Sequence, residues 1–138
     1  MRLGHNSKID LIKRVPLFAS ASKQELAEIA SIADEIDLPD GKTLIREGDS
    51  GREFFVLIDG SAEVQRSGKK VASLGAGDFF GEIALIAKTP RNATITTTSP
   101  VRALVITDRA FRQLLDHSPQ IAVGVLTALA ERLAPTTL

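Results

Sequence analysis

The middle of the chain is a succession of short β-type runs separated by glycine turns, and this pattern constrains the fold more than any other feature. The runs lie at about 35–39, 43–47, 53–58, 61–67, 70–74, 93–99 and 101–107. Turn signals such as Asp40-Gly41, Gly48-Asp49 and Gly68 separate them. Many short strands at close spacing are typical of a β-barrel or a β-sandwich. Between two of these runs, Asp59-Gly60 predicts a hairpin with positive φ at the turn.

Helical patterns precede and follow this β region. Ser22 followed three residues later by Glu25 is a capping box, which predicts the start of a helix with apolar residues at helical spacing behind it. After Thr107 the spacing of apolar residues is helical again. The sequence therefore predicts one domain over residues 1–138, with helices at 8–14 and 22–33, a barrel at 35–107 and C-terminal helices at 108–134.

The last predicted helix, which starts at Pro119, is apolar on nearly every face. No charged residue occurs from Ile121 to Ala130. A helix that is apolar all round needs partners on more than one side. Three interpretations stay open: burial within the monomer, a lid over a ligand, or the seam of a homodimer through residues 119–134.

The charge and the cysteine count exclude several classes of protein. Lys+Arg and Asp+Glu number 17 each, so the chain lacks the basic excess typical of proteins that bind nucleic acid or an anionic membrane. With no cysteine, neither a disulfide framework nor a thiolate metal site is available. No apolar run reaches membrane-spanning length and the N-terminus has no signal-peptide core. We therefore expect a soluble, cytoplasmic protein.

The segment 79–94, which reads FFGEIALIAKTPRNAT, carries the groups suited to a ligand. Gly81 opens a short helix and lets the backbone approach a ligand closely, and the N–H groups of residues 82–85 are donors at a helix start, where an anion is favoured. Arg91 offers a bidentate fork to a phosphate, and the carboxylate of Glu82 accepts hydrogen bonds from sugar hydroxyls. This set of groups suits a ligand with one phosphate and one sugar.

Plainer interpretations compete with each residue. Arg91 alone reads as a surface arginine, and Glu82 as an acid placed favourably in a first helical turn. Their occurrence together with Gly81, beside the apolar run Ile83–Ile86, favours a site.

Other nucleotide and catalytic motifs are missing. The glycines at 75, 77 and 81 do not have dinucleotide-binding spacing, and no glycine-rich run ends in Gly-Lys-Ser/Thr. A metal-dependent barrel normally needs several histidines, whereas only His5 and His117 occur. The sequence therefore predicts no catalysis and no metal site.

The cassette Phe-Gly-Glu-x-Ala-Leu, a short spacer and then Pro-Arg-x-Ala-Thr resembles the phosphate-binding cassette of the cyclic-nucleotide-binding domain family. The segments Val15–Phe18, Ile45–Gly51 and Phe54–Gly60 also resemble parts of that family, so the resemblance extends from about residue 9 to 134. It implies a mainly β fold: an eight-stranded jelly-roll barrel with N-terminal helices, a short phosphate-cassette helix and C-terminal helices, holding a cyclic nucleotide.

The resemblance also assigns roles to residues of this chain. Arg91 would pair with the cyclic phosphate and Glu82 would accept from the ribose 2′-hydroxyl. The backbone would contact the sugar and phosphate at Gly81, Ile83, Ala84 and Ala93. In the family, alanine after the arginine goes with adenine ligands and threonine often with guanine; Asn92 is neither. We therefore expect cAMP, with cGMP as the alternative.

As a whole, the resemblance implies a cyclic-nucleotide sensor with no catalysis of its own, whose C-terminal helices rearrange on binding. Its effector is either a partner protein or the remainder of a larger channel or kinase. A barrel that has lost its ligand and serves as a dimerisation scaffold is the alternative. The transcription-factor branch continues into a helix-turn-helix, but this chain stops at Leu138, which with the balanced charge predicts no DNA binding.

Overall fold

The computed structural model describes residues 3–133 and divides into two compact units. One unit is a β unit, residues 34–109; the other is a helical unit formed by the segments before and after it in the sequence. The predicted end of the last helix at residue 134 lies outside the described residues.

The β unit contains eight strands, which confirms a mainly β fold. They are β1 (Asp34–Leu38), β2 (Thr43–Ile45), β3 (Glu53–Asp59), β4 (Ala62–Arg66), β5 (Lys69–Leu74), β6 (Phe79–Phe80), β7 (Thr94–Thr97) and β8 (Val101–Thr107). Seven of them match the predicted runs to within two residues. The pattern missed β6 as a strand because two residues are too few to show an alternation of apolar and polar side chains.

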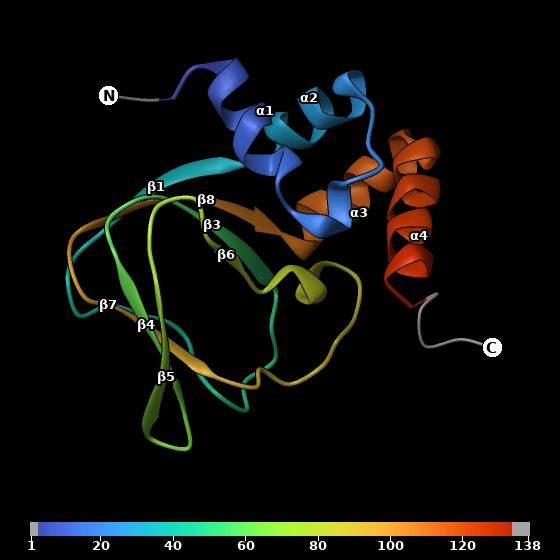
Figure 1. Ribbon diagram of the computed structural model, residues 1–138. Helices are drawn as coiled ribbons and strands as arrows, with labels where there is room; N and C mark the ends of the chain where they lie inside the picture. The colour runs from blue at the N-terminus through green and yellow to red at the C-terminus, as the bar shows by residue number, and fades with distance from the viewer. Residues whose placement is uncertain (1–2, 134–138) are drawn as a thin grey trace. The chain divides into compact units, whose positions relative to one another are not determined.

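The strands form two antiparallel sheets of four strands, ordered β1-β8-β3-β6 and β2-β7-β4-β5 (Figure 1). Buried side chains from both sheets form one apolar cluster: Ile45, Phe55, Leu57, Ala62, Ile95, Val101, Ala103 and Val105. The two sheets therefore pack face to face over a shared core. The strand pairing gives two sheets, and it does not close them into a single hydrogen-bonded barrel in the described part of the chain.

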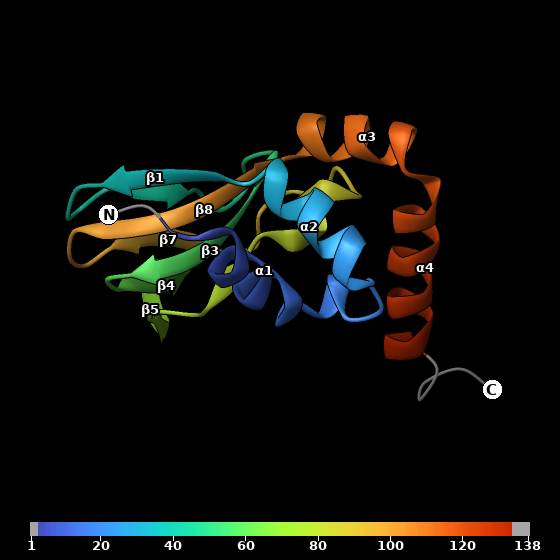
Figure 2. The same ribbon diagram turned by 90° about the horizontal axis from the view of Figure 1, so that it is seen from above.

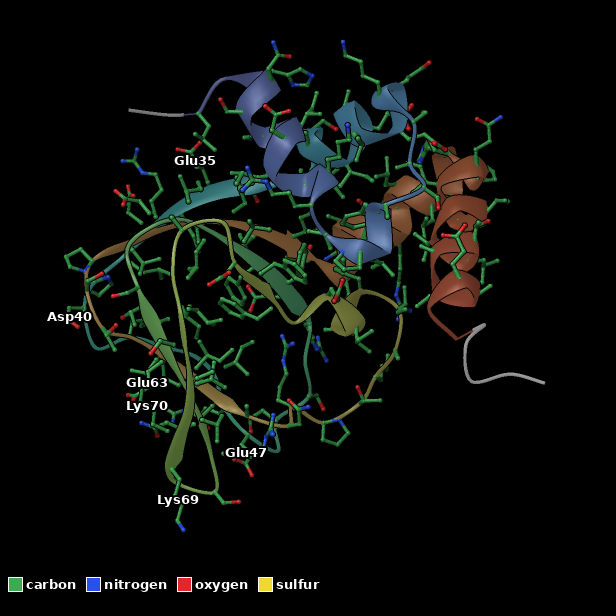
Figure 3. The ribbon with its side chains drawn as sticks, in the orientation of Figure 1. Glu35, Asp40, Glu47, Glu63, Lys69 and Lys70 are labelled. Carbon is green, nitrogen blue, oxygen red and sulfur yellow. The ribbon has the colours of Figure 1, made fainter. Side chains whose placement is uncertain are left out.

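The hairpin predicted at Asp59-Gly60 is wrong, although Gly60 does have a positive φ of 96°. This turn joins β3 to β4, which belong to different sheets. Because β3 already pairs with β8 on one side and β6 on the other, it has no edge left for β4. The true hairpin is β4–β5, turning through Ser67 and Gly68 with φ of 53° and 79°. Figure 3 shows Lys69 at its tip, pointing away from the sheets.

The helical unit contains α1 (His5–Lys13), the short η1 (Pro16–Phe18), α2 (Lys23–Ser31) and α4 (Pro119–Leu133), while α3 (Asp108–His117) begins in the last residues of the β unit. The capping box is confirmed. The Ser22 hydroxyl accepts from the Glu25 N–H at 3.1 Å, and a Glu25 carboxylate oxygen accepts from the Ser22 N–H at 2.7 Å. Helix α1 begins three residues before the prediction, since Gly4 precedes a polar first turn without apolar spacing.

Helix α4 turns sharply away from α3 at Ser118 and Pro119 (Figure 2). Its residues Ile121, Val125 and Ala128 are buried, and the helix contacts η1. Val123 and Leu126 are 61% and 66% exposed. Burial within the monomer therefore accounts for one face of this apolar helix, and no residue from 3 to 133 covers the face that carries Val123 and Leu126. In the stretch from residue 3 to residue 133, no helix combines the length and the apolar character needed to cross a membrane.

Candidate functional site

Gly81 opens a single helical turn, η2 (Glu82–Leu85), as its sequence position predicted. Its φ is 84°, a left-handed conformation that favours glycine. A Cβ at this position would lie 2.6 Å from Arg91 Nη1 and 2.9 Å from the Glu53 carbonyl oxygen. Both the backbone conformation and the close approach of Arg91 therefore require a glycine here.

The prediction that all four N–H groups of residues 82–85 are available donors is wrong for Ala84. The Ala84 N–H donates to the Gly81 carbonyl at 3.1 Å, and Ile86 repeats this pattern with Ile83 at 3.0 Å. The turn is a 3₁₀ turn, in which each bond spans three residues, so the first intrahelical bond uses an N–H one residue earlier than in an α-helix.

Arg91 is held at both its backbone and its side chain. Its N–H donates to the Asp49 carbonyl and its own carbonyl accepts from the Gly48 N–H, both at 2.8 Å. The half-buried side chain donates through Nη2 to the Glu53 carbonyl, with Nη1 3.5 Å from the Gly81 carbonyl. The guanidinium is therefore oriented by main-chain oxygens of β3 and of the cassette.

Burial lowers the pKa of Arg91, and the negative charge of Glu53 opposes that shift. Since the ordinary pKa of an arginine lies far above neutral pH, the group stays a cation. The site therefore presents one fixed positive charge with partial shielding from water.

A cavity of about 300 Å³ opens beside Arg91, at the lower end of the range for small-molecule sites. Six of the seven predicted ligand residues line it: Gly81, Glu82, Ile83, Ala84, Arg91 and Asn92, together with Thr89 and Pro90. The seventh, Ala93, is 6% exposed and is not part of the lining. The structure thus brings the Arg91 guanidinium and the Glu82 carboxylate together in one pocket. One oxygen of this carboxylate, Glu82 Oε2, is buried.

Three neighbours of this pocket were missed by the sequence reasoning as part of the site. Gly51 lies directly beneath the Arg91 side chain, and Glu53 supplies the carbonyl that fixes it. Arg66, at the end of β4, donates from Nε to the Asn92 carbonyl at 3.0 Å. Only Gly51 has a signal in the sequence, because it ends the segment Ile45–Gly51 that resembles part of the family.

Arg102 and His117 make contacts that do not involve the residues lining this pocket. Arg102 on β8 bonds Asp37 on β1 at 2.9 Å across neighbouring strands. His117 Nδ1 lies 2.8 Å from the Gln113 carbonyl one helical turn earlier. Among the described residues, no three His, Cys, Asp or Glu side chains come together as a metal site would require.

Two face-to-face antiparallel sheets, with a pocket at a one-turn helix, define a small two-sheet β domain with a candidate ligand site. The model of the family described as "Cyclic nucleotide-binding domain" matches residues 35–118, more than half of the chain. The chain belongs to this family of nucleotide-binding regulatory domains.

Curated relatives and a solved structure agree with the family model. The chain is 36% identical over 109 residues to a cAMP-dependent protein kinase regulatory subunit of Schizosaccharomyces pombe, covering 78% of this chain and 26% of that protein. It is also 36% identical over 122 residues to a cyclic nucleotide-gated potassium channel of Rhizobium etli, covering 88% and 34%. The N-terminal domain of a transcriptional regulator from Streptomyces coelicolor superposes with a TM-score of 0.84 at 32% identity, covering 93% of this chain and 95% of that one. The chain thus spans about a quarter to a third of these two curated relatives.

Proposed function

We propose that this chain is a sensor module that binds a cyclic nucleotide, with cAMP preferred over cGMP. The observation that carries the proposal is the convergence of Arg91 and Glu82 on one pocket, with Gly81 packed against the arginine. A guanidinium binds a phosphate, and a carboxylate accepts hydrogen bonds from sugar hydroxyls. The pair can therefore bind the phosphate and the ribose of a cyclic nucleotide, which are the same for every base. Membership of the family supports the same ligand class.

In this proposal, Arg91 pairs with the cyclic phosphate and Glu82 accepts from the ribose 2′-hydroxyl. Main-chain groups of Gly81, Ile83 and Ala93 contact the sugar and phosphate, and Ala84 does so through its carbonyl or Cβ, since its N–H is used within the turn. Asn92 is exposed at the pocket and influences the choice of base.

We further propose that ligand binding is read out by the C-terminal helices, which would make the chain a regulatory module without catalysis of its own. A ligand can bias such a change only by binding the two conformations with different affinities. Amide hydrogen exchange over residues 108–133 should therefore differ between the nucleotide-bound and the unbound chain. Identical protection in both states would contradict this part of the proposal.

The relatives suggest where such a module acts. One is a regulatory subunit of a kinase and another is a channel, and each is three to four times longer than the matched region. We propose either a regulatory domain of a larger protein or a free-standing receptor that acts on a partner protein. We also propose a cytoplasmic location. For the fold, we propose that both sheets form an eight-stranded jelly-roll barrel within one domain over residues 1–138.

Calorimetric titration of the chain with cAMP, and in parallel with cGMP, tests the proposal directly. We expect saturable one-to-one binding, and the ratio of the two affinities measures the base preference. Arg91→Ala should weaken binding by about 2–5 kcal/mol, because it leaves a partly buried phosphate charge without its partner. Absence of binding at millimolar nucleotide would reject the sensor function.

A second candidate function, a dimerisation scaffold that does not bind nucleotide, is favoured by one observation. The uncovered face of α4 presents Val123 and Leu126, both more than 60% exposed. Such a face suits a second copy of the chain.

A further inference from the structure

Gly51 lies in the β2–β3 loop, and its backbone conformation does not explain why this residue is a glycine. Its φ lies outside the left-handed range, unlike that of Gly48 in the same loop, whose φ is 89°. Gly51 is also buried, whereas nothing lies within 4 Å of a Cβ built on Gly48. The reason for a glycine at position 51 must therefore be sought in what packs against it.

The neighbour is the side chain of Arg91. A Cβ on Gly51 would lie 2.6 Å from Arg91 Cζ and 3.0 Å from its Cδ, and closer still to Nε. Real Cβ atoms do not approach other heavy atoms to these distances, so one of the two groups would have to move. The Arg91 side chain is the movable group, because its backbone is bonded to Asp49 and Gly48 on both sides.

We infer that Gly51 is a positioning residue for Arg91: the missing side chain at Gly51 leaves the space that the Arg91 side chain occupies where it lines the pocket. This inference rests on the proposed function and deepens it. The two main-chain acceptors, Glu53 O and Gly81 O, fix the outer nitrogens, and the absence of a Cβ at Gly51 leaves room for the inner part of the fork. Gly51 itself contributes no group to the pocket lining.

The substitution Gly51→Ala separates this role from a role in folding. The three atoms nearest to the added methyl group all belong to the flexible Arg91 side chain, so the fold should be retained. The guanidinium, however, should leave its orientation, so that the phosphate loses part of the contact that Arg91→Ala would remove completely. We expect cAMP affinity to fall about 10- to 100-fold. Gly75→Ala is the matched control, because Gly75 also lacks a positive φ and nothing lies within 4 Å of its Cβ position; its affinity should stay within about twofold.

A thermal-unfolding cycle without nucleotide tests whether Gly51 acts through Arg91. In the presence of Arg91, Gly51→Ala should leave the unfolding midpoint unchanged or lower it, because the arginine loses its main-chain acceptors. In an Arg91→Ala background the conflict is gone, and alanine should raise the midpoint by about 1–4 °C by restricting the unfolded chain. A glycine that serves only the loop should instead give the same shift of the midpoint in both backgrounds.

The outcomes separate the two proposals. Wild-type affinity in Gly51→Ala, or an equal shift of the midpoint in both backgrounds, would overturn the positioning role even if cAMP binds. A wild-type chain that binds neither cAMP nor cGMP would reject the proposed function, and the unfolding cycle would still decide whether Gly51 controls the conformation of Arg91.

Discussion

At the scale of single residues, the pocket depends on one cation that is fixed by main-chain oxygens. The Glu53 carbonyl accepts from Arg91, while the exposed Glu53 carboxylate places a negative charge near the same guanidinium. The backbone contact orients the arginine, and the side-chain charge works against a bound anion. These two effects of one residue can be separated by changing only the side chain.

Glu53→Gln should strengthen the binding of cAMP by about 1.4- to fivefold, because an exposed charge pair contributes about 0.2–1 kcal/mol. The gain should shrink as salt is raised from 50 mM to 500 mM, since screening removes the effect of an exposed charge. Titration calorimetry at both salt concentrations measures it. Asp40→Asn removes the same charge in the β1–β2 turn and is the control (Figure 3). Unchanged or weaker binding by Glu53→Gln would contradict the prediction.

Glu82→Ala should weaken cAMP binding by about 1.5–3 kcal/mol, the contribution of a hydrogen bond to a charged group. The same change should have less than a twofold effect on the binding of 2′-deoxy-cAMP, which lacks the hydroxyl that Glu82 is proposed to hold. Titrating wild type and variant with both ligands completes the comparison. If the variant still discriminates against the deoxy ligand as the wild type does, Glu82 does not contact the ribose.

The chemistry of the site was more predictable from the sequence than its geometry. Gly81, Glu82 and Arg91 were singled out because their side chains, or the lack of one, have obvious uses with an anion and a sugar. Gly51 and Glu53 were not, since Gly51 acts by leaving space and Glu53 acts through its carbonyl, which every residue has. The backbone carbonyl that faces a guanidinium depends on how the strands are placed, and it cannot be inferred from the type of residue.

At the scale of elements, local sequence signals predicted a capped helix start and a turn correctly, whereas they did not predict which strands pair. The capping box at Ser22 formed as predicted because both of its bonds lie within four residues. The turn at Asp59-Gly60 also formed, but it crosses between sheets because β8 and β6 already occupy both sides of β3. A turn sequence fixes local φ angles, whereas the choice of partner strand depends on residues far away in the chain.

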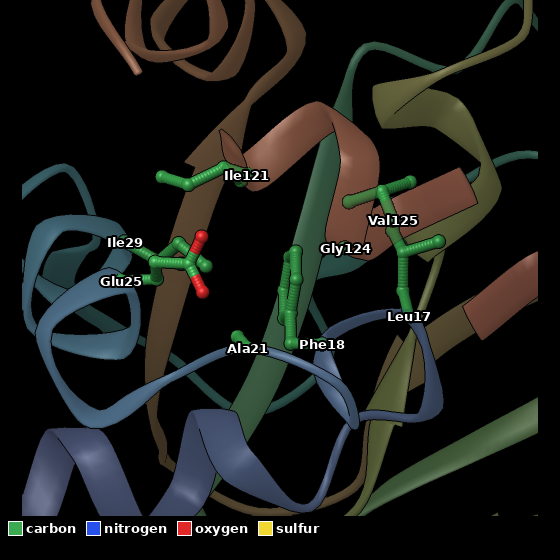
Figure 4. Close-up of a pocket in the computed structure, with 8 residues that line it drawn as sticks. All are labelled: Leu17, Phe18, Ala21, Glu25, Ile29, Ile121, Gly124 and Val125. Atoms are coloured by element: carbon green, nitrogen blue, oxygen red, sulfur yellow. The ribbon is translucent and has the colours of Figure 1, made fainter. Parts of the chain in front are cut away.

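Helix α4 contains a glycine, Gly124, whose replacement should increase the stability of the protein. Gly124 lies beside a small void lined by apolar groups such as Leu17 and Phe18, too small for a water molecule (Figure 4). A Cβ at this position would meet nothing closer than the Ser20 carbonyl at 4.0 Å. The glycine therefore weakens the helix without a packing reason in the helical unit.

Gly124→Ala should raise the free energy of unfolding by about 0.5–1 kcal/mol through helix propensity. Urea unfolding followed by circular dichroism measures the change. The reciprocal substitution Ala130→Gly, at an exposed position of the same helix, should lower it by a similar amount. Destabilisation by Gly124→Ala would show that the methyl group does not fit beside Ser20.

At the scale of the whole molecule, tests of the exposed apolar face of α4 can distinguish a sensor from a dimerisation scaffold. If a homodimer forms through this face, Leu126→Glu should shift the chain toward monomer, because it places a charge in an apolar contact. The fold should change little, since Leu126 is 66% exposed. Sedimentation velocity with and without cAMP measures the association.

Gln120→Glu adds the same charge at an exposed position near the start of the helix and should leave association unchanged. A wild-type chain that is monomeric at all concentrations would reject the homodimer. A dimer that binds no nucleotide would favour the scaffold function over the sensor.

The pairing of β1 with β8 has a consequence for the architecture of larger proteins. These strands are the first and last of the β unit, and their register places Asp34 opposite Val105, so the chain enters and leaves the unit at neighbouring points. A unit with adjacent ends can be inserted into another polypeptide, or copied in tandem, without stretching the host chain. The pairing of the first strand with the last thus brings the two ends of the β unit into the arrangement that insertion or tandem copying requires.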